Sequence, residues 1–175
     1  MITRRRTPWT VALVALIISV LWGVAHGQSS AHLEALQWIQ SAQQWRTTSF
    51  APLYRELNSR GLRSAEPNDV VRGPDLVPGF LPDYRHATDG YYDVMSRFFA
   101  DESPITLLMT SNDVDSKYLG SAMDAYSYNI QALHRVLESF AYGSATVQEI
   151  QYWYQIATLW GSIASLNMNL YFNSQ

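Results

Sequence analysis

The hydropathy pattern begins with an apolar run from Trp9 to Ala25, shortly after the basic cluster Arg4–Arg6. As an α-helix this run would span about 25 Å, close to the roughly 30 Å hydrocarbon core of a bilayer. Aromatic side chains lie near both ends, where they anchor helices at membrane interfaces. The segment therefore predicts a single transmembrane helix, whose anchoring side chains are Trp9, Leu13, Leu16, Ile17, Ile18, Leu21 and Trp22.

The same order of basic cluster, apolar run and small residues is also typical of a cleaved secretory signal peptide. Residues 1–27 are therefore either an anchor or a signal, and we favour the anchor because the run is longer than a usual signal core. The next cation after the run is Arg46, so the positive-inside rule places Met1 in the cytoplasm. Both alternatives make residues 28–175 extracytoplasmic, which means periplasmic in a bacterium.

Beyond residue 28 the apolar positions recur every three or four residues, the period of helices that bury one face. Capping residues bound several of these segments. Asp113 or Asp115 begins the clearest one and Gly143 ends it, and Thr146 with Glu149 forms a capping-box pair before the last. The pattern predicts an all-α bundle of four to six helices, over Ser30–Arg46, Pro52–Arg60, a segment starting at Thr88 or Asp89, Ser103–Met109, a segment from Asp113 or Asp115 to Gly143, and Thr146–Gln175.

One stretch, from Leu62 to Arg85, interrupts the helical pattern. Four prolines and two glycines are spaced along it so closely that we expect no helix to cross it. Long irregular segments are uncommon in compact domains and usually have a function. This one is too apolar for a free linker, so residues 62–85 predict an extended arm that lies over this domain or over a partner.

The last predicted helix is unusual because no charged side chain follows Glu149. Its Gln and Asn side chains would be costly in lipid, so it does not predict a second membrane span. A helix without charges is usually central in its bundle or covered by a partner, and we expect the central position. The alternative is a subunit or membrane-surface interface, for which the candidate residues here and in the arm are Trp153, Tyr154, Trp160, Tyr171, Phe80 and Leu81.

Composition narrows the range of functions. Apolar residues make up 47% of the chain and aromatic residues 13%, which predicts a folded core. Outside the Arg4–Arg6 cluster, nine basic residues stand against fifteen acidic ones, a net charge of −6. Such an acidic domain argues against nucleic acid and anionic lipid as ligands. The absence of cysteine excludes disulfides, thiolate metal sites and thiol catalysis.

Candidate metal ligands are few. His134 and Glu138 are one helical turn apart, but further ligands are missing, and a surface hydrogen-bonded pair explains them better. Asp113 and Asp115 begin like a calcium loop, yet the glycine and the final glutamate of that loop are absent. Helix capping is therefore their expected role. We expect neither a metal nor a cofactor.

Catalytic candidates are equally sparse. Asp89 and Asp93 could form an acid–base pair for a hydrolase, although exposed acids in the first turn of a helix explain them more simply. The observations favour a non-catalytic accessory or scaffold subunit of a larger membrane protein complex, for example a respiratory or photosynthetic one. Its partners would be an integral membrane complex and, through the N-terminal helix, the bilayer. The alternative is a cleaved, soluble exported domain that binds a small or apolar ligand between its helices.

Overall fold

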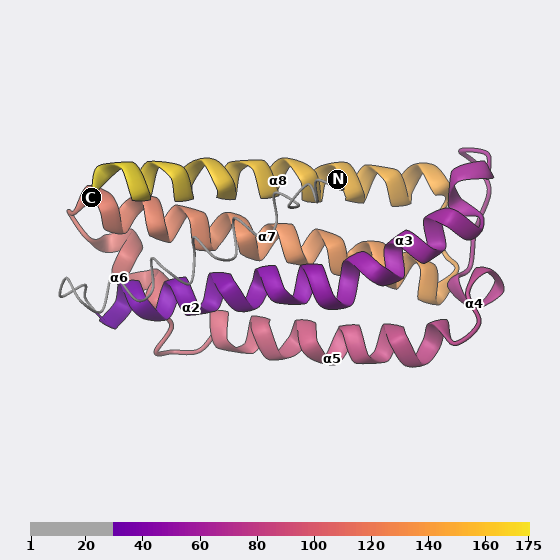
Figure 1. Cartoon of the computed structure of the whole chain (residues 1–175), viewed down its shortest axis with the longest axis horizontal. Coiled ribbons are helices and arrows are strands. Elements are labelled where there is room, and N and C mark those ends of the chain that lie inside the picture. The colour runs from indigo at the N-terminus through magenta and orange to yellow at the C-terminus, as the bar shows by residue number, and fades with distance from the viewer. Residues whose placement is uncertain (1–29) are drawn as a thin grey trace, which may run out of the picture.

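The structure, a computed structural model, describes residues 30–175 and is all-α, as predicted (Figure 1). This part contains six α-helices longer than a single turn, the upper end of the predicted number, and it has no β-strand. Within the same residues, no helix is long and apolar enough to cross a membrane. The predicted anchor or signal, residues 1–27, lies outside the described residues, and so do its membrane-anchoring side chains.

The first helical element is longer than predicted because two helices join end to end. α2 (Ser30–Trp45) continues through one π-helical turn, η1 (Arg46–Phe50), into α3 (Ala51–Arg60), which ends before Gly61 as predicted. Pro52 has no N–H to donate to the carbonyl four residues earlier, so the regular α-helical ladder is interrupted here. The wider π turn absorbs this interruption without a break in the helix.

The Pro-rich segment lies on the domain itself. It contains a 3-10 turn, η2 (Leu62–Ser64), and a single helical turn, α4 (Gly73–Leu76). The backbone N–H of Val147 donates to the carbonyl of Asp69 at 2.9 Å. Val147 is the first residue of the last helix, and its N–H has no partner within that helix. The Pro-rich segment supplies the missing hydrogen-bond acceptor.

The segment ends earlier than predicted, because α5 (Phe80–Phe98) begins at Phe80 and not at Thr88 or Asp89. Pro82, which suggested a break, is the third residue of this helix. The first four N–H groups of an α-helix have no partner within the helix, so a proline there removes no hydrogen bond. Gly79 precedes the helix with a φ of +83°, the left-handed conformation that glycine adopts without strain.

α6 (Pro104–Thr110) and α7 (Val114–Tyr142) lie where the sequence predicts them. The Asp113 side chain caps α7 by accepting a hydrogen bond from the backbone N–H of Ser116 at 2.9 Å, and Gly143 ends the helix with a φ of +59°. α7 contacts α2, α5, α6 and α8, and 17 of its 29 residues are buried. It is therefore the central helix of the bundle.

α8 (Val147–Ser174) begins at the predicted capping box, in which the Thr146 hydroxyl accepts from the N–H of Glu149. The helix runs back along α7 and packs almost entirely against it (Figure 1). The expected central position of this helix is therefore wrong, because α8 lies at the edge of the bundle. Small buried residues such as Ala157 and Ala164 face α7 and allow the two helices to pack closely.

Candidate functional site

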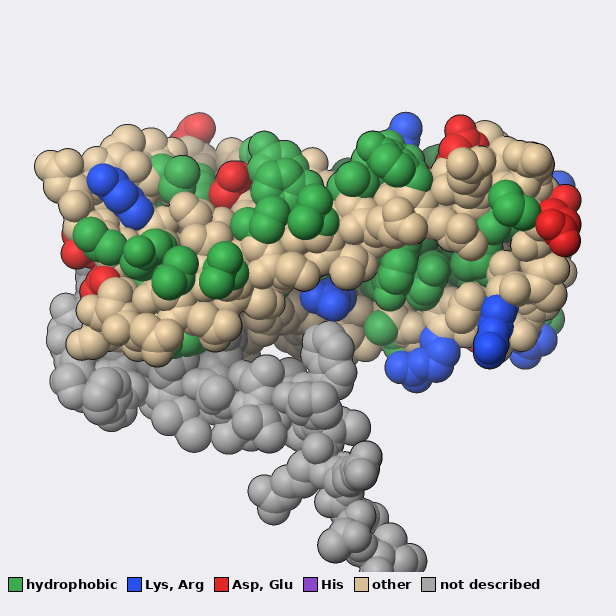
Figure 2. Space-filling model, turned by 90° about the horizontal axis from the view of Figure 1, so that it is seen from above, with side chains coloured by type: hydrophobic (Ala, Val, Ile, Leu, Met, Phe, Trp, Pro, Cys, Tyr) green, Lys and Arg blue, Asp and Glu red, His purple; other side chains and the backbone are tan. Residues whose placement is uncertain are grey.

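α8 presents a wide uncharged surface to solvent. Tyr152, Leu159 and Leu166 follow one another at seven-residue steps, and their side chains are 56%, 57% and 59% exposed. Seven residues are close to two helical turns, so these side chains form one line along the helix. Seen from the α8 side, apolar side chains recur along the length of the molecule (Figure 2). We call this line the outer face of α8.

The apolar surface continues from α8 onto α7. Trp160 stacks on Tyr128 of α7, with ring centroids 4.7 Å apart, and Tyr128 remains 44% exposed. Trp153 lies against the guanidinium of Arg135, also on α7, at 6.0 Å from the ring centroid. Both tryptophans are half-buried. They hold one flank of α8 on the central helix and keep part of their rings accessible.

The six candidate interface residues do not form one surface. Tyr171 and Phe80 are 0% and 1% exposed, so they are core side chains and unavailable to a partner in this structure. Leu81 is exposed but belongs to the first turn of α5. Tyr154 is exposed on the flank of α8 that faces α3, where it stacks on Tyr54. Only the two tryptophans of α8 lie beside the outer face.

Sequence reasoning missed Leu159 and Leu166, which are more exposed than any of the six candidates. Both are leucines, whereas most of the six candidates are large aromatic residues, and an exposed leucine contributes to an apolar surface as an aromatic side chain does. The seven-residue spacing from Tyr152 was the signal that could have identified them.

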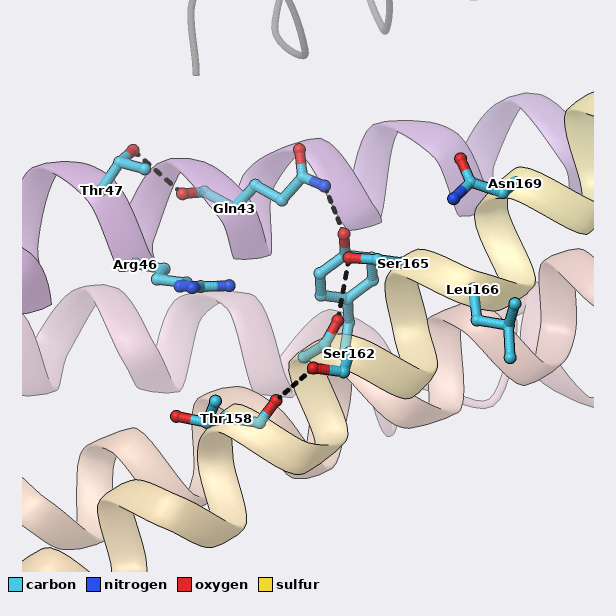
Figure 3. Close-up of a pocket in the computed structure, with 10 residues that line it drawn as sticks. Gln43, Arg46, Thr47, Thr158, Ser162, Ser165, Leu166 and Asn169 are labelled. Carbon is cyan, nitrogen blue, oxygen red and sulfur yellow. Dashed lines mark hydrogen bonds between the residues drawn. The ribbon is translucent and has the colours of Figure 1, made fainter. Parts of the chain in front are cut away.

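A groove separates α8 from α2 and α3. It consists of two adjoining cavities with volumes of about 550 Å³ and 480 Å³, and Arg46, Thr47 and Thr158 line both. Figure 3 shows the first cavity, in which Arg46 extends into the space between the helices and hydroxyl and amide side chains surround it. Among the described residues that line the two cavities there is no acidic side chain, so this part of the lining carries a net positive charge.

The π turn η1 forms one wall of this groove, and π turns are frequent at functional sites. Beside it, Tyr54 of α3 stacks on Tyr154 of α8 and on Phe50, with centroids 4.6 Å and 5.3 Å apart. Burial, with a smaller contribution from Tyr154, raises the pKa of Tyr54 to about 12. The phenol of Tyr54 therefore stays neutral at physiological pH.

Asn129 of α7 lies at the base of the groove and is 2% exposed. Its Nδ2 donates to the backbone carbonyl of Ala157 at 2.6 Å, whereas its Oδ1 has no hydrogen-bond partner among the described residues. Gly161 makes room at this point, because a Cβ there would lie 3.1 Å from Asn129 Nδ2 and 3.5 Å from Arg46 Nη1. The close approach of α7, α8 and η1 thus depends on a glycine.

His134 is buried, at 4% exposure, and not on the surface as expected. Its ring stacks on Tyr91, and its Nε2 lies 3.2 Å from the hydroxyl of Thr88. Glu138 is close, at 3.8 Å from Nδ1, but within residues 30–175 no group of three or more His, Asp or Glu side chains is arranged to hold a metal. His134 is therefore a core side chain between α5 and α7.

The aspartates have structural positions. Asp89 and Asp93 are exposed in the middle of α5 and not in its first turn, because that helix begins earlier than expected. Asp93 forms an ion pair with Arg97 at 3.2 Å. Asp113 is the cap of α7, so the expected capping role is confirmed for this residue. Asp115 lies in the first turn of the same helix, where its charge complements the helix dipole.

No protein-family model, curated protein or solved structure matches this chain.

Proposed function

We propose that this chain is a non-catalytic accessory or scaffold subunit that docks on a larger membrane protein complex through the outer face of α8. The observation that supports this proposal is the line of Tyr152, Leu159 and Leu166, exposed on an edge helix. Single exposed apolar residues are common on any protein, whereas contiguous apolar surface marks interaction sites. Burying these side chains against a partner would remove apolar surface from water, which is the main driving force of association.

The chemistry of α8 indicates what kind of partner it accepts. No charged residue follows Glu149. A charged partner surface would lose its hydration on binding to α8 and would find no opposite charge there, which would disfavour the contact. Hydroxyl and amide side chains flank the apolar line and can donate or accept hydrogen bonds. An apolar or weakly polar helix of an integral membrane complex satisfies both conditions.

The N-terminal segment gives this docking its location. An uncleaved anchor in residues 1–27, with Met1 in the cytoplasm, would hold the helical domain outside the cytoplasm beside the complexes of the same membrane. Tethering two partners to one membrane raises their effective concentration, so a modest docking surface would suffice.

The test is co-purification of the full chain from its native membrane in mild detergent. We expect an integral membrane complex to be recovered with it, and the double variant Leu159→Glu with Leu166→Glu to lose that partner. Leu107→Glu is the matched control, since Leu107 is 66% exposed on α6, away from α8, and should keep the partner. Recovery of the unaltered protein solely as a soluble monomer would contradict the proposal.

A second candidate function is ligand binding by a cleaved, soluble domain, and the groove beside α8 favours it. The intact mass of the mature protein separates the two functions. Loss of residues 1–27 would support the soluble binding domain, and retention would support the anchored subunit. An exported hydrolase ranks last, and it would require an activity that disappears in Asp93→Asn.

A further inference from the structure

We propose that the groove between α2–α3 and α8 binds a small planar organic anion that carries an N–H or O–H donor. Three features of the described residues converge there: positively charged lining, a buried acceptor without a partner, and an aromatic wall. The site lies on the flank of α8 that faces α2. Leu166 of the outer face also lines the first cavity, whereas none of the three outer-face residues lines the second cavity, where the buried acceptor and the aromatic wall lie.

The charge of the groove selects an anion. Arg46, on the π turn, is half-buried and lines both cavities, and Arg55 of α3 lines the second one. The lining residues within 30–175 include no carboxylate, so an incoming carboxylate, sulfonate or phosphate would meet two guanidinium groups and, from these residues, no like charge. Partial burial strengthens this attraction because water screens it less than at an open surface.

The buried amide of Asn129 favours a ligand that carries a hydrogen-bond donor. Its Nδ2 is already bonded to the carbonyl of Ala157, which fixes the orientation of the amide and leaves Oδ1 as an unsatisfied acceptor. A buried acceptor without a partner costs free energy that a hydrogen bond from a ligand would recover. Oδ1 is covered, so binding requires a neighbouring side chain to shift, and the long side chain of Arg46 lies near the amide of Asn129, across from Gly161.

The aromatic wall selects a planar ligand. Tyr54, Tyr154 and Phe50 form a stacked set along the second cavity, and a further ring can pack against their faces or edges. The volume of about 480 Å³ is within the range of small-molecule sites. Because Tyr54 stays protonated, its phenol adds no negative charge that would repel an anion.

The first experiment compares two fluorescent probes on the full chain. 8-Anilinonaphthalene-1-sulfonate has planar rings, an N–H donor and a sulfonate, and N-phenyl-1-naphthylamine is the same molecule without the sulfonate. We expect saturable binding of the sulfonate probe, with an affinity about tenfold or more above that of the neutral probe, as a charged hydrogen bond provides. Equal affinities would overturn the assignment of the groove to anions.

The second experiment locates the bound probe. Arg46→Gln removes the cation and Gly161→Ala fills the space next to Asn129, so each should weaken binding of the sulfonate probe about tenfold. Arg97→Gln, an exposed arginine on α5, is the matched control for charge, and Leu159→Gln tests adsorption to the outer face. Both controls should leave the affinity unchanged.

Unchanged binding in Arg46→Gln would overturn the proposal, as would a loss of binding in Leu159→Gln. Circular dichroism checks that each variant folds. If Gly161→Ala unfolds, Arg46→Gln alone decides, once its circular dichroism spectrum matches that of the unaltered protein. Failure of the groove to bind leaves the docking proposal untouched, since co-purification through the outer face is measured separately.

Discussion

The imidazole of His134 on α7 lies flat against the phenol ring of Tyr91 on α5, with centroids 4.0 Å and ring planes 5° apart. Tyr84 and Tyr92 of the same helix also contact this imidazole. Burial lowers the pKa of His134, an effect that Glu138 opposes and Arg135 reinforces. The contact between α5 and α7 is therefore built around a neutral histidine.

Acid should weaken this contact. Because the pKa of His134 is lower in the folded chain than its ordinary value of 6.5, the unfolded chain binds a proton first. The stability that depends on neutral His134 is complete above about pH 6.5 and is lost as the pH falls through the lower folded pKa. We expect this group to change the free energy of unfolding by at most about 1.4 kcal/mol per pH unit.

Urea unfolding at several pH values between about 5 and about 8 measures this dependence. His134→Phe keeps an aromatic ring at this position but cannot be protonated, so its stability should fall less steeply below about pH 6.5. The other titratable groups are present in both proteins, so the difference between the two curves reports His134 together with its interaction with Glu138. Parallel curves would contradict the prediction.

Removal of the α8 cap should destabilise the chain. Thr146 accepts from the N–H of Glu149, and the Glu149 carboxylate accepts from the backbone N–H of Thr146 at 2.7 Å. Thr146→Ala removes one half of this reciprocal pair, so we expect a loss of about 1 kcal/mol in the free energy of unfolding. Thr110→Ala, at the C-terminal end of α6, is the control and should change stability less. Equal losses in both variants would show that the cap contributes nothing specific.

The Pro-rich segment packs so closely on the core that a larger side chain at Gly73 should destabilise the chain. A Cβ at this position would lie 2.6 Å from the ring of Phe80, which is buried. We expect Gly73→Ala to lower the free energy of unfolding by about 1–3 kcal/mol, the usual effect of overpacking. In a Phe80→Leu background the ring is absent and the same substitution should cost less. Additive effects in this double-mutant cycle would show that the two side chains do not meet.

Substitutions on the buried face of α8 should lower the stability of the chain, whereas substitutions on its outer face should leave it almost unchanged. Ala164 is completely buried against α7, so Ala164→Leu should destabilise the chain by about 1–3 kcal/mol through overpacking. Leu159 is 57% exposed, and Leu159→Gln should change stability by less than about 0.5 kcal/mol. Thermal unfolding of the two variants measures both effects. A large loss in Leu159→Gln would place the outer face inside the fold.

The amino-acid sequence by itself determined the helical class and most helix ends. Asp113, Gly143 and the Thr146–Glu149 pair act on backbone groups within a few residues of themselves, so their role can be read without knowing what packs nearby. The sequence pattern places the start of α5 too late, because prolines usually interrupt a helix, whereas Pro82 falls where a helix needs no N–H donor.

Only the tertiary structure decided which helix is central. Lack of charge in α8 is compatible with a core position and with a covered surface, and the choice depends on which helices offer it a complementary face. α7 takes the centre because it buries side chains towards α2, α5 and α8 at once. The groove has the same origin, because Asn129 and Gly161 lie on different helices and meet only where α8 folds back along α7.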